Sequence, residues 1–351
     1  MGTSDGKHSY NQLFNKGVDL SEYNTMGVSA KAQLFLEITD KNQLIHLADS
    51  GFFDRENELL FGGGSNILLK ADLKRPVLHM AITGIEVSDE SQNEIKVKFG
   101  AGEEWHSVVE WAVGRNYGGI ENLALIPGTT GAAPIQNIGA YGAELSDTFE
   151  KLEYFDTETN EFQTLTKEEC GFGYRDSIFK HELKGRAIIT NVTLKLVKSG
   201  HVVNSSYASL KSYLEEKEIY SPGIRDVFDA VVAIRKSKLP DPGLYGNAGS
   251  FFKNPVINNE IHQRLKENYP DMPSYQLDNG YFKIPSGWLI DYAGWRGLKV
   301  GNVGCYENQA LVIVNHGGAT GKEIFEFAMK VQKSVKDLFG IELVPEVNII
   351  D

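Results

Sequence analysis

The hydrophobic and polar positions of this chain form short alternating runs interleaved with amphipathic stretches. Residues 31–39, 93–99 and 186–197 alternate apolar and polar side chains, as strands with one buried face do. Residues 102–115 and 321–339 instead repeat apolar side chains every three or four positions, which is typical of helices. Strands and helices follow one another without a regular βαβ rhythm, so we predict an α+β fold.

The same patterns predict the remaining elements. Further strands are expected at 58–61, 67–69, 150–155, 309–314 and 341–350. Further helices are expected at 40–50, 207–219, 225–235 and 259–268, the first with Asp40 as its N-cap. The turn residues Ser221-Pro222-Gly223 mark a boundary between the front and the back of the chain.

Composition narrows the class of protein. A chain of 351 residues with 41% hydrophobic residues can bury the core of two or three domains. A net charge of −12 argues against broad binding to nucleic acid or to anionic membranes. No apolar run reaches membrane-spanning length, and residues 1–8 lack the features of a signal peptide.

The chain has two cysteines, Cys170 and Cys305, which cannot form a disulfide framework and do not have the spacing of metal ligands. We therefore expect a protein of the reducing cytoplasm, without a metal site.

A glycine-rich loop, Gly62-Gly63-Gly64-Ser65-Asn66, separates two predicted strands. Successive glycines let several backbone amides converge on an anion. The loop is not the dinucleotide fingerprint, because Ile67 stands at the third glycine position and a strand follows. Taken alone, this loop is explained equally well as a tight turn between the two strands.

A second glycine-rich loop covers residues 127–142 and consists mostly of small residues. We expect that nothing in it builds a core and that its backbone lies against a flat ligand. Together the two loops indicate a bound dinucleotide, with pyrophosphate on the amides and a ring system over the small residues. A surface loop without a ligand is the alternative.

Three polar residues in glycine- and aromatic-rich contexts could provide chemistry. Ser250 lies between Gly246-Asn247-Ala248-Gly249 and Phe251-Phe252, where we expect bare backbone on one side and aromatic surface on the other. Arg175 could bind a carboxylate in a bidentate manner, and Glu346 would be costly to bury without a partner. A turn serine, a structural ion pair with Asp176 and a solvated glutamate are the ordinary alternatives.

Several blocks of the sequence occur in the order of one known family: Asn24-Thr25-Met26-Gly27, Gly64-Ser65-Asn66, Ile126-Pro127-Gly128, residues 136–142, residues 173–179, Lys238-Leu239-Pro240-Asp241-Pro242, residues 246–255 and Pro345-Glu346-Val347. Over nearly its whole length the chain resembles the UDP-N-acetylenolpyruvoylglucosamine reductases, often called MurB. It is most similar to their longer branch, in which a tyrosine-bearing loop closes over the substrate; residues 200–220 correspond to that loop.

The resemblance implies a fold and a domain arrangement. It implies an FAD-binding region of the vanillyl-alcohol-oxidase (PCMH) type in two parts, 1–90 and 91–220, and a smaller α+β substrate-binding domain at 221–341. The final strand, 342–351, would return near the first part.

The resemblance also implies a reaction. NADPH would reduce FAD, and the reduced flavin would pass hydride from N5 to C3 of the enolpyruvyl ether of UDP-N-acetylglucosamine-enolpyruvate, giving UDP-N-acetylmuramate for peptidoglycan. Ser250 would supply the proton at C2, while Arg175 and Glu346 would stabilise the enolate, with the pKa of Glu346 raised by burial. We expect a cytoplasmic monomer that binds the UDP-sugar and neither nucleic acid nor membrane.

The remaining contacts follow from matching motif positions. FAD contacts fall in the two glycine-rich loops, at Gly62, Gly63, Gly64, Ser65, Asn66, Gly128, Thr129, Thr130, Gly131, Ala132, Gln136 and Ile138. Contacts to the UDP-sugar fall at Tyr141, Tyr207, Arg235, Lys238, Lys253, Asn254 and Gln309. Ala132 and Ala133 depart from the family, since relatives often carry serine or glycine there.

Two other hypotheses stay open at this point. A sugar or alcohol oxidase of the same flavin class would keep the cofactor but change the chemistry. A module that binds nucleotide sugars without turnover would need no flavin.

Overall fold

The computed structural model describes residues 10–54 and 57–351 and divides into two compact units. The first unit comprises residues up to 18, 32–63 and 73–235, and the second comprises 19–31, 64–72 and 236–351. The predicted three-part division into 1–90, 91–220 and 221–341 stays a prediction. The first nine residues, where we expected no signal peptide, lie outside the described residues.

The first unit contains a small sheet in the strand order β1-β2-β5-β3. Its strands are β1 (Asn15–Asp19), β2 (Lys31–Ile38), β5 (Val77–Met80) and β3 (Leu59–Phe61). Strand β5 pairs in parallel with both β2 and β3. Helix α2 (Lys41–Asp49) starts after Asp40, whose side chain caps it as the sequence predicts.

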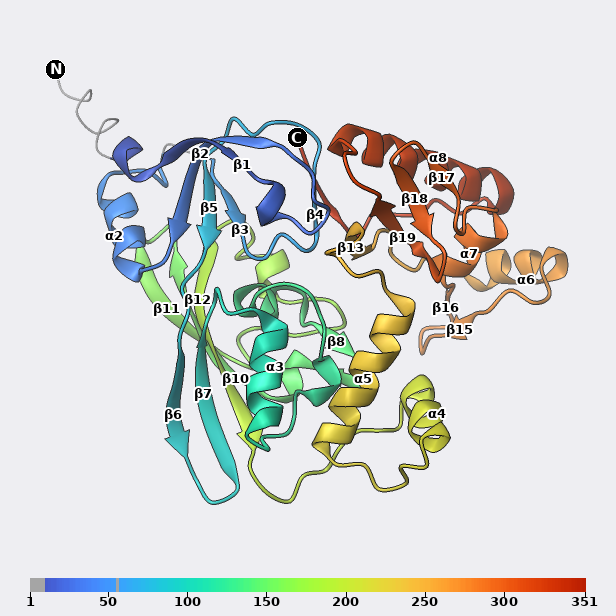
Figure 1. Cartoon of the computed structure of the whole chain (residues 1–351), viewed down its shortest axis with the longest axis horizontal. Coiled ribbons are helices and arrows are strands. Elements are labelled where there is room, and N and C mark those ends of the chain that lie inside the picture. The colour runs from blue at the N-terminus through green and yellow to red at the C-terminus, as the bar shows by residue number, and fades with distance from the viewer. Residues whose placement is uncertain (1–9, 55–56) are drawn as a thin grey trace. The chain divides into compact units, whose positions relative to one another are not determined.

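A five-stranded antiparallel sheet, β11-β10-β12-β7-β6, forms the rest of the unit's framework (Figure 1). Its strands are β6 (Ile85–Glu90), β7 (Glu94–Gly100), β10 (Phe149–Asp156), β11 (Glu161–Thr166) and β12 (Ala187–Val197). Helix α3 (Trp105–Gly114) buries the apolar face that the sequence predicts. The other elements are helices α4 (Ala208–Glu216) and α5 (Ile224–Lys238) and the short hairpin β8 (Gly139–Ala140) and β9 (Ala143–Glu144).

The second unit is built on the antiparallel sheet β13-β19-β18-β17. Its strands are β13 (Gly246–Ser250), β17 (Lys299–Val300), β18 (Val303–Tyr306) and β19 (Gln309–Asn315). Helices α6 (Asn259–Asn268), α7 (Ser286–Tyr292) and α8 (Gly321–Phe339) accompany it, with a small sheet of β14 (Val256–Ile257), β15 (Tyr275–Gln276) and β16 (Phe282–Lys283).

The end of the chain departs from the prediction. We predicted a strand over 341–350, but strand β20 covers only Asn348–Ile350, where it pairs in parallel with β4 (Ile67–Leu69). Pro345 interrupts the strand, since it has no amide hydrogen for a ladder, and forms one isolated bridge with Phe252. Glu346 therefore lies in the short connection between that bridge and β20.

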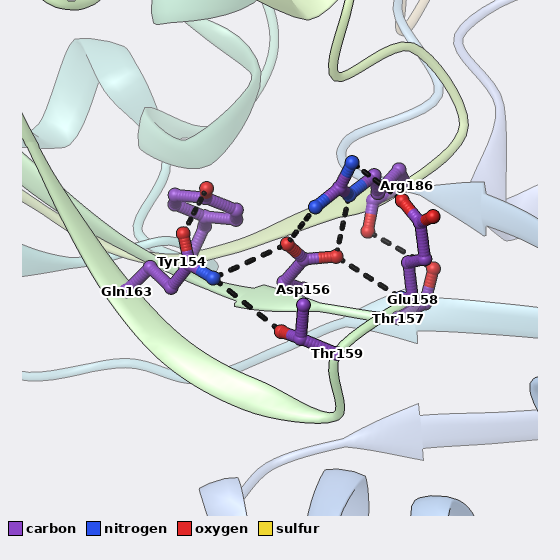
Figure 2. A network of polar contacts seen from close by, with 7 residues as sticks. All are labelled: Tyr154, Asp156, Thr157, Glu158, Thr159, Gln163 and Arg186. Carbon is purple, nitrogen blue, oxygen red and sulfur yellow. Dashed lines mark hydrogen bonds and ion pairs between the residues drawn. The ribbon is translucent and has the colours of Figure 1, made fainter.

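A buried ionic network fixes the outer edge of the five-stranded sheet (Figure 2). The carboxylate of Asp156, fully buried at the end of β10, accepts hydrogen bonds from Arg186 Nε at 2.7 Å and Nη2 at 2.6 Å. It also accepts from the backbone amide of Glu158 and from Gln163 Nε2. The hydrogen bonds from Arg186 hold the pKa of Asp156 below its ordinary value. The network ties the β10–β11 hairpin to the residue preceding β12.

Asp156→Asn is expected to lower the free energy of unfolding by about 3 kcal/mol at pH 7, because it leaves the guanidinium without its buried partner. In the folded state the pKa of Asp156 lies below its ordinary value of 3.8, so the stabilisation is fully present above pH 3.8. It is lost as the pH falls through the lower, folded-state pKa. Urea unfolding of both proteins at several pH values measures the effect.

Glu158→Gln is the matched control, because Glu158 pairs with the same arginine but its side chain is 70% exposed. We expect it to cost less than about 1 kcal/mol. Equal losses for the two variants would contradict the assignment of the stability to the buried carboxylate.

Candidate functional site

A β-bulge sets the position of Ser250 at the end of β13. Asn247 pairs with Val314 and Ser250 with Val312, so β13 carries one more residue than β19 over this interval. The bulge includes Gly249, whose φ of 67° is a conformation that glycine adopts without strain. As a result the Ser250 side chain is exposed while its backbone stays hydrogen-bonded in the sheet.

The two phenylalanines after Ser250 anchor this segment in the core. Phe251 and Phe252 are each 1% exposed, and their ring centroids lie 5.1 Å apart. The expectation that they form aromatic surface beside the hydroxyl was therefore wrong. Their burial fixes where the strand ends, and hence where Ser250 lies.

Backbone pairing brings Glu346 next to this segment. The amide of Glu346 donates to the carbonyl of Phe251 at 2.8 Å, and the amide of Lys253 donates to the carbonyl of Val344 at 2.8 Å. The Glu346 side chain belongs to a half-buried residue. Ser250 and Glu346, predicted from separate parts of the sequence, are thus held in one unit by the same backbone ladder.

The first glycine-rich loop is tied to the same place through its last residue. Asn66 Nδ2 donates to the carbonyl of Glu346 at 3.3 Å, and the Asn66 carbonyl accepts from the amide of Asn348 at 3.0 Å. At Gly64, a Cβ would lie 2.0 Å from the carbonyl oxygen of Tyr23, so no side chain fits. Residues 64–66 are therefore fixed against the rest of the second unit.

Two predicted nucleotide contacts, Asn254 and Gln309, are organised by the start of helix α7. The amide of Ser286 donates to Asn254 Oδ1 at 2.9 Å, so the Asn254 NH₂ group is the part left to face a ligand. A Cβ on Gly287 would lie 2.8 Å from Gln309 Oε1, so the Gln309 side chain packs against the glycine backbone. Ser286 Oγ also donates to the carbonyl of Lys253 at 2.5 Å. No pattern in the sequence points to Ser286 or Gly287.

In the first unit two predicted substrate tyrosines lie together. The rings of Tyr141 and Tyr207 meet edge to face, with centroids 5.4 Å apart. Tyr207 precedes helix α4 and is half-exposed, whereas Tyr141 follows β8 and takes a left-handed backbone conformation with a φ of 50°. Burial raises the pKa of Tyr141, and the charge of Arg235 lowers it.

Two arginines accompany these tyrosines. Arg235, in α5, donates through Nε to the carbonyl of Leu125 at 3.2 Å, and burial lowers its pKa, with the charge of Arg175 lowering it further. Arg175 Nη2 donates to the carbonyl of Gly139 at 2.7 Å. Within residues 10–54 and 57–351 neither arginine forms an ion pair with a carboxylate. Asp176, the alternative partner we considered for Arg175, pairs instead with His181 at 2.9 Å.

The two glycine-rich loops touch within the first unit. A Cβ on Gly62 would lie 2.6 Å from Thr129 Oγ1, and one on Gly63 would lie 3.1 Å from the Cα of Gly128. Among the described residues, Thr129 Oγ1 is buried and has no hydrogen-bond partner. An orphaned hydroxyl beside two glycine amides fits a site for a polar, anionic group such as a flavin pyrophosphate.

Part of the second loop does not behave as predicted. The amides of Thr130 and Gly131 donate to the carbonyls of Glu103 and Ala101, so they are not available to an anion. The expectation that the loop contributes nothing to a core was also wrong, since Ala133 and Ile138 are buried in the unit's hydrophobic cluster. Ala132 and Gln136 are half-buried.

Lys238 and Lys253, two of the predicted nucleotide contacts, are exposed to solvent, which is the usual environment of a lysine. Lys238 is the last residue of α5.

Comparison with known proteins places the chain among flavin-dependent enzymes. Residues 241–350 match the family model for the C-terminal domain of UDP-N-acetylenolpyruvoylglucosamine reductase, and residues 52–165 match that of an FAD binding domain. The reductase of Flavobacterium johnsoniae is 44% identical over 94% of this chain and 98% of its own. That of Amoebophilus asiaticus is 45% identical over 95% and 98%.

A solved structure agrees with these matches. The crystal structure of the reductase of Thermus caldophilus has a TM-score of 0.67 and 25% identity, over 95% of this chain and 98% of its own. The matches confirm the predicted α+β fold class, with an FAD-binding region and a separate C-terminal domain, and they confirm FAD as cofactor. Within the described residues, none of the helices has the length and apolar character needed to cross a membrane.

Thr129→Val is expected to have opposite effects on the apoprotein and on flavin binding. Removing a buried hydroxyl without a partner should raise the free energy of unfolding of the apoprotein by about 1 kcal/mol. Removing a hydrogen-bonding group from the flavin site should weaken FAD binding about tenfold. Urea unfolding of apoprotein and fluorescence titration with FAD measure the two quantities.

Thr190→Val is the control, because Thr190 is fully buried and its hydroxyl donates to the Glu153 carboxylate at 2.6 Å. It should lose stability and keep its affinity for FAD. A loss of apoprotein stability in both variants would show that Thr129 is satisfied within the protein.

Proposed function

The chain belongs to the UDP-N-acetylenolpyruvoylglucosamine reductase family, and from that premise we propose that it reduces the enolpyruvyl ether of UDP-N-acetylglucosamine-enolpyruvate with electrons from NADPH. As a member of that family it is an oxidoreductase and a flavoprotein that uses FAD. The product would be UDP-N-acetylmuramate, a precursor of peptidoglycan.

The pair of half-buried arginines in the first unit is the observation that carries the choice of substrate. Arg175 and Arg235 are close enough for one to lower the pKa of the other, yet neither has a carboxylate partner among the described residues. Two cations left uncompensated in a partly buried place are stabilised by an anionic ligand. A nucleoside diphosphate with an attached carboxylate supplies such charges.

Ser250 is our candidate for the proton donor. Its side chain is exposed at the end of β13, while the bulge at Gly249 and the buried Phe251 fix its backbone. A serine hydroxyl is a weak acid, so it can act only when a carbanion develops beside it. The proton would pass from Ser250 Oγ to C2 of the substrate, and solvent would restore it afterwards.

Arg175 and Glu346 are our candidates for stabilising the enolate. The guanidinium of Arg175, held in place by its bond to Gly139, can bind the substrate carboxylate with two parallel hydrogen bonds as negative charge grows. Glu346 is half-buried and held by its backbone bond to Phe251. Bound FAD supplies the hydride that C3 receives, and residues 62–66 with Gly128, Thr129 and Ala132 would hold it.

Tyr141, Tyr207, Arg235, Lys238, Lys253, Asn254 and Gln309 are proposed to bind the UDP-sugar. The Asn254 side chain offers the two hydrogen-bond donors of its NH₂ group, while its oxygen already accepts from the Ser286 amide. It therefore fits an acceptor such as a phosphate or uracil oxygen.

We also propose a cytoplasmic location and a monomer. Cys170 and Cys305 are both unpaired and buried, and burial raises the pKa of each thiol to about 12. Thiols that stay protonated have little tendency to react, which fits a reducing compartment.

The visible spectrum of the purified protein tests the function directly. We expect flavin absorption that NADPH bleaches without oxygen, and that UDP-N-acetylglucosamine-enolpyruvate then restores. A protein that holds no flavin and takes up none when FAD is added would overturn the proposal. Restoration of the colour by simple sugars and oxygen, with no response to the enolpyruvyl substrate, would indicate an oxidase.

Ser250→Ala is expected to separate the two half-reactions. Flavin reduction by NADPH should keep its rate, while reoxidation by substrate should slow by about 10²- to 10⁴-fold, because the proton donor acts only in the second step. Stopped-flow absorbance measures both rates. Glu346→Gln should give the same asymmetry.

Ser88→Ala is the matched control, since Ser88 is an exposed strand serine in β6. It should leave both half-reactions unchanged. If Ser250→Ala slowed both half-reactions equally, the residue would have a structural role and not the one proposed.

A further inference from the structure

A buried asparagine joins the two segments that carry the substrate tyrosines. Asn122 is 3% exposed and lies in the short 3-10 turn Glu121–Leu123. Its Nδ2 donates one hydrogen bond to the carbonyl of Tyr141 at 2.9 Å and another to the carbonyl of Asn204 at 2.8 Å. Both hydrogens of one amide group therefore bind backbone, one in each of the two segments.

Asn204 extends this connection in two directions. Its Nδ2 donates to the carbonyl of Gly142 at 2.8 Å, which adds a second bond between the same two segments. Its Oδ1 accepts from the Ser206 hydroxyl at 2.8 Å and from the Ser206 amide at 3.2 Å. Ser206 directly precedes Tyr207, the N-cap residue of α4, so these bonds determine where the helix and its tyrosine begin.

The backbone of Tyr141 needs such support. Its φ of 50° is unusual for a bulky residue, and strained conformations of this kind persist only where neighbouring contacts fix them. The bond from Asn122 to the Tyr141 carbonyl is one such contact, and the bond from Asn204 to Gly142 is the next.

We propose that Asn122 is a positioning residue of the nucleotide site. By binding the carbonyls of Tyr141 and Asn204 it holds the ring of Tyr207 against that of Tyr141, and in this way it sets the affinity for the uridine diphosphate part of the substrate. The inference rests on the proposed function, because it assigns the two tyrosines to that ligand.

An asparagine side chain is suited to donate to both carbonyls, and an aspartate or alanine side chain at position 122 is not. A carboxylate at position 122 would direct negative charge at two carbonyl oxygens, and an alanine would leave both oxygens without this donor in a buried place. Asn122 is 3% exposed and both of its donors are used by backbone, so its effect on the substrate is proposed to pass through the tyrosines.

A double-mutant cycle tests this with Asn122→Ala, Tyr207→Ala and the double variant as holoenzymes. In the wild-type background Asn122→Ala should raise KM for the enolpyruvyl substrate about tenfold with a smaller change in kcat, and NADPH should still reduce the flavin at the normal rate. In the Tyr207→Ala background the same substitution should change KM by less than about twofold.

Asn24→Ala is the matched control. Asn24 is 6% exposed, and its Nδ2 also donates to two backbone carbonyls, those of Leu20 at 2.7 Å and Val28 at 2.9 Å, within the second unit. Asn24→Ala should lower the free energy of unfolding as Asn122→Ala does. Any change in KM that it causes should be the same in the wild-type and the Tyr207→Ala backgrounds. Additive effects of Asn122→Ala and Tyr207→Ala would overturn the proposal and leave Asn122 a purely structural residue.

Hydrogen exchange gives a readout that does not depend on activity. Without nucleotide, the amides of residues 204–211 should exchange faster in the Asn122→Ala holoenzyme than in the wild type, and at the wild-type rate in Asn24→Ala. Unchanged exchange there would overturn the positioning role. A wild-type protein that shows no reductase turnover would overturn the proposed function instead, while exchange would still report on the Asn122 contacts.

If Asn122→Ala does not fold, Asn204→Ala takes its place in the cycle. Asn204 is only half-buried, and its loss removes the bonds to Gly142 and Ser206. The same dependence on Tyr207 is expected, and additive effects would count against the proposal in the same way.

Discussion

The short backbone ladder between residues 251–253 and 344–346 is the constraint on which the chemistry of the second unit depends. It consists of the bonds from Glu346 to Phe251 and from Lys253 to Val344, with the bridge of Phe252 and Pro345 between them. The buried phenylalanine rings hold one strand of this ladder in the core. Ser250 and Glu346 therefore keep their spacing through backbone contacts, and these contacts do not depend on a ligand.

Charge in this protein has to be considered locally. A net charge of −12 argues against a polyanionic partner, yet the first unit keeps Arg175 and Arg235 within electrostatic reach of each other. Mutual repulsion and burial both disfavour this arrangement, and the bonds from these arginines to Gly139 and Leu125 offset only part of the cost. A bound anion would offset the remaining electrostatic cost. An enzyme that binds a sugar nucleotide has such an anion in its substrate.

Sequence patterns predicted the elements with strong periodicity, but not the contacts that position the candidate site residues. Helix α8 and strand β12 follow the predicted ranges because their apolar faces are continuous. Strand β13 escaped prediction because Gly-Asn-Ala-Gly-Ser has no apolar alternation, and its pairing with β19 is a tertiary effect. Family motifs pointed to Ser250, whereas nothing in the sequence around Asn122 indicates two long-range backbone bonds.

Part of the backbone strain in the first unit lies on the segments that carry the predicted site. Among the described residues of this unit, seven non-glycine residues have left-handed φ values, and four of these lie on the site segments: Leu125, Asn137, Tyr141 and Arg175. At three of the four a side chain binds the strained residue's own peptide: His106 accepts from the amide of Leu125, Asn122 donates to the carbonyl of Tyr141, and Lys180 donates to that of Arg175. A loop built only of flexible glycines could adopt these conformations at lower cost, but it would also leave them when no ligand is bound. Strained residues held by polar side chains keep the arginine and tyrosine side chains oriented before the substrate arrives, so less of the binding energy is spent on ordering them.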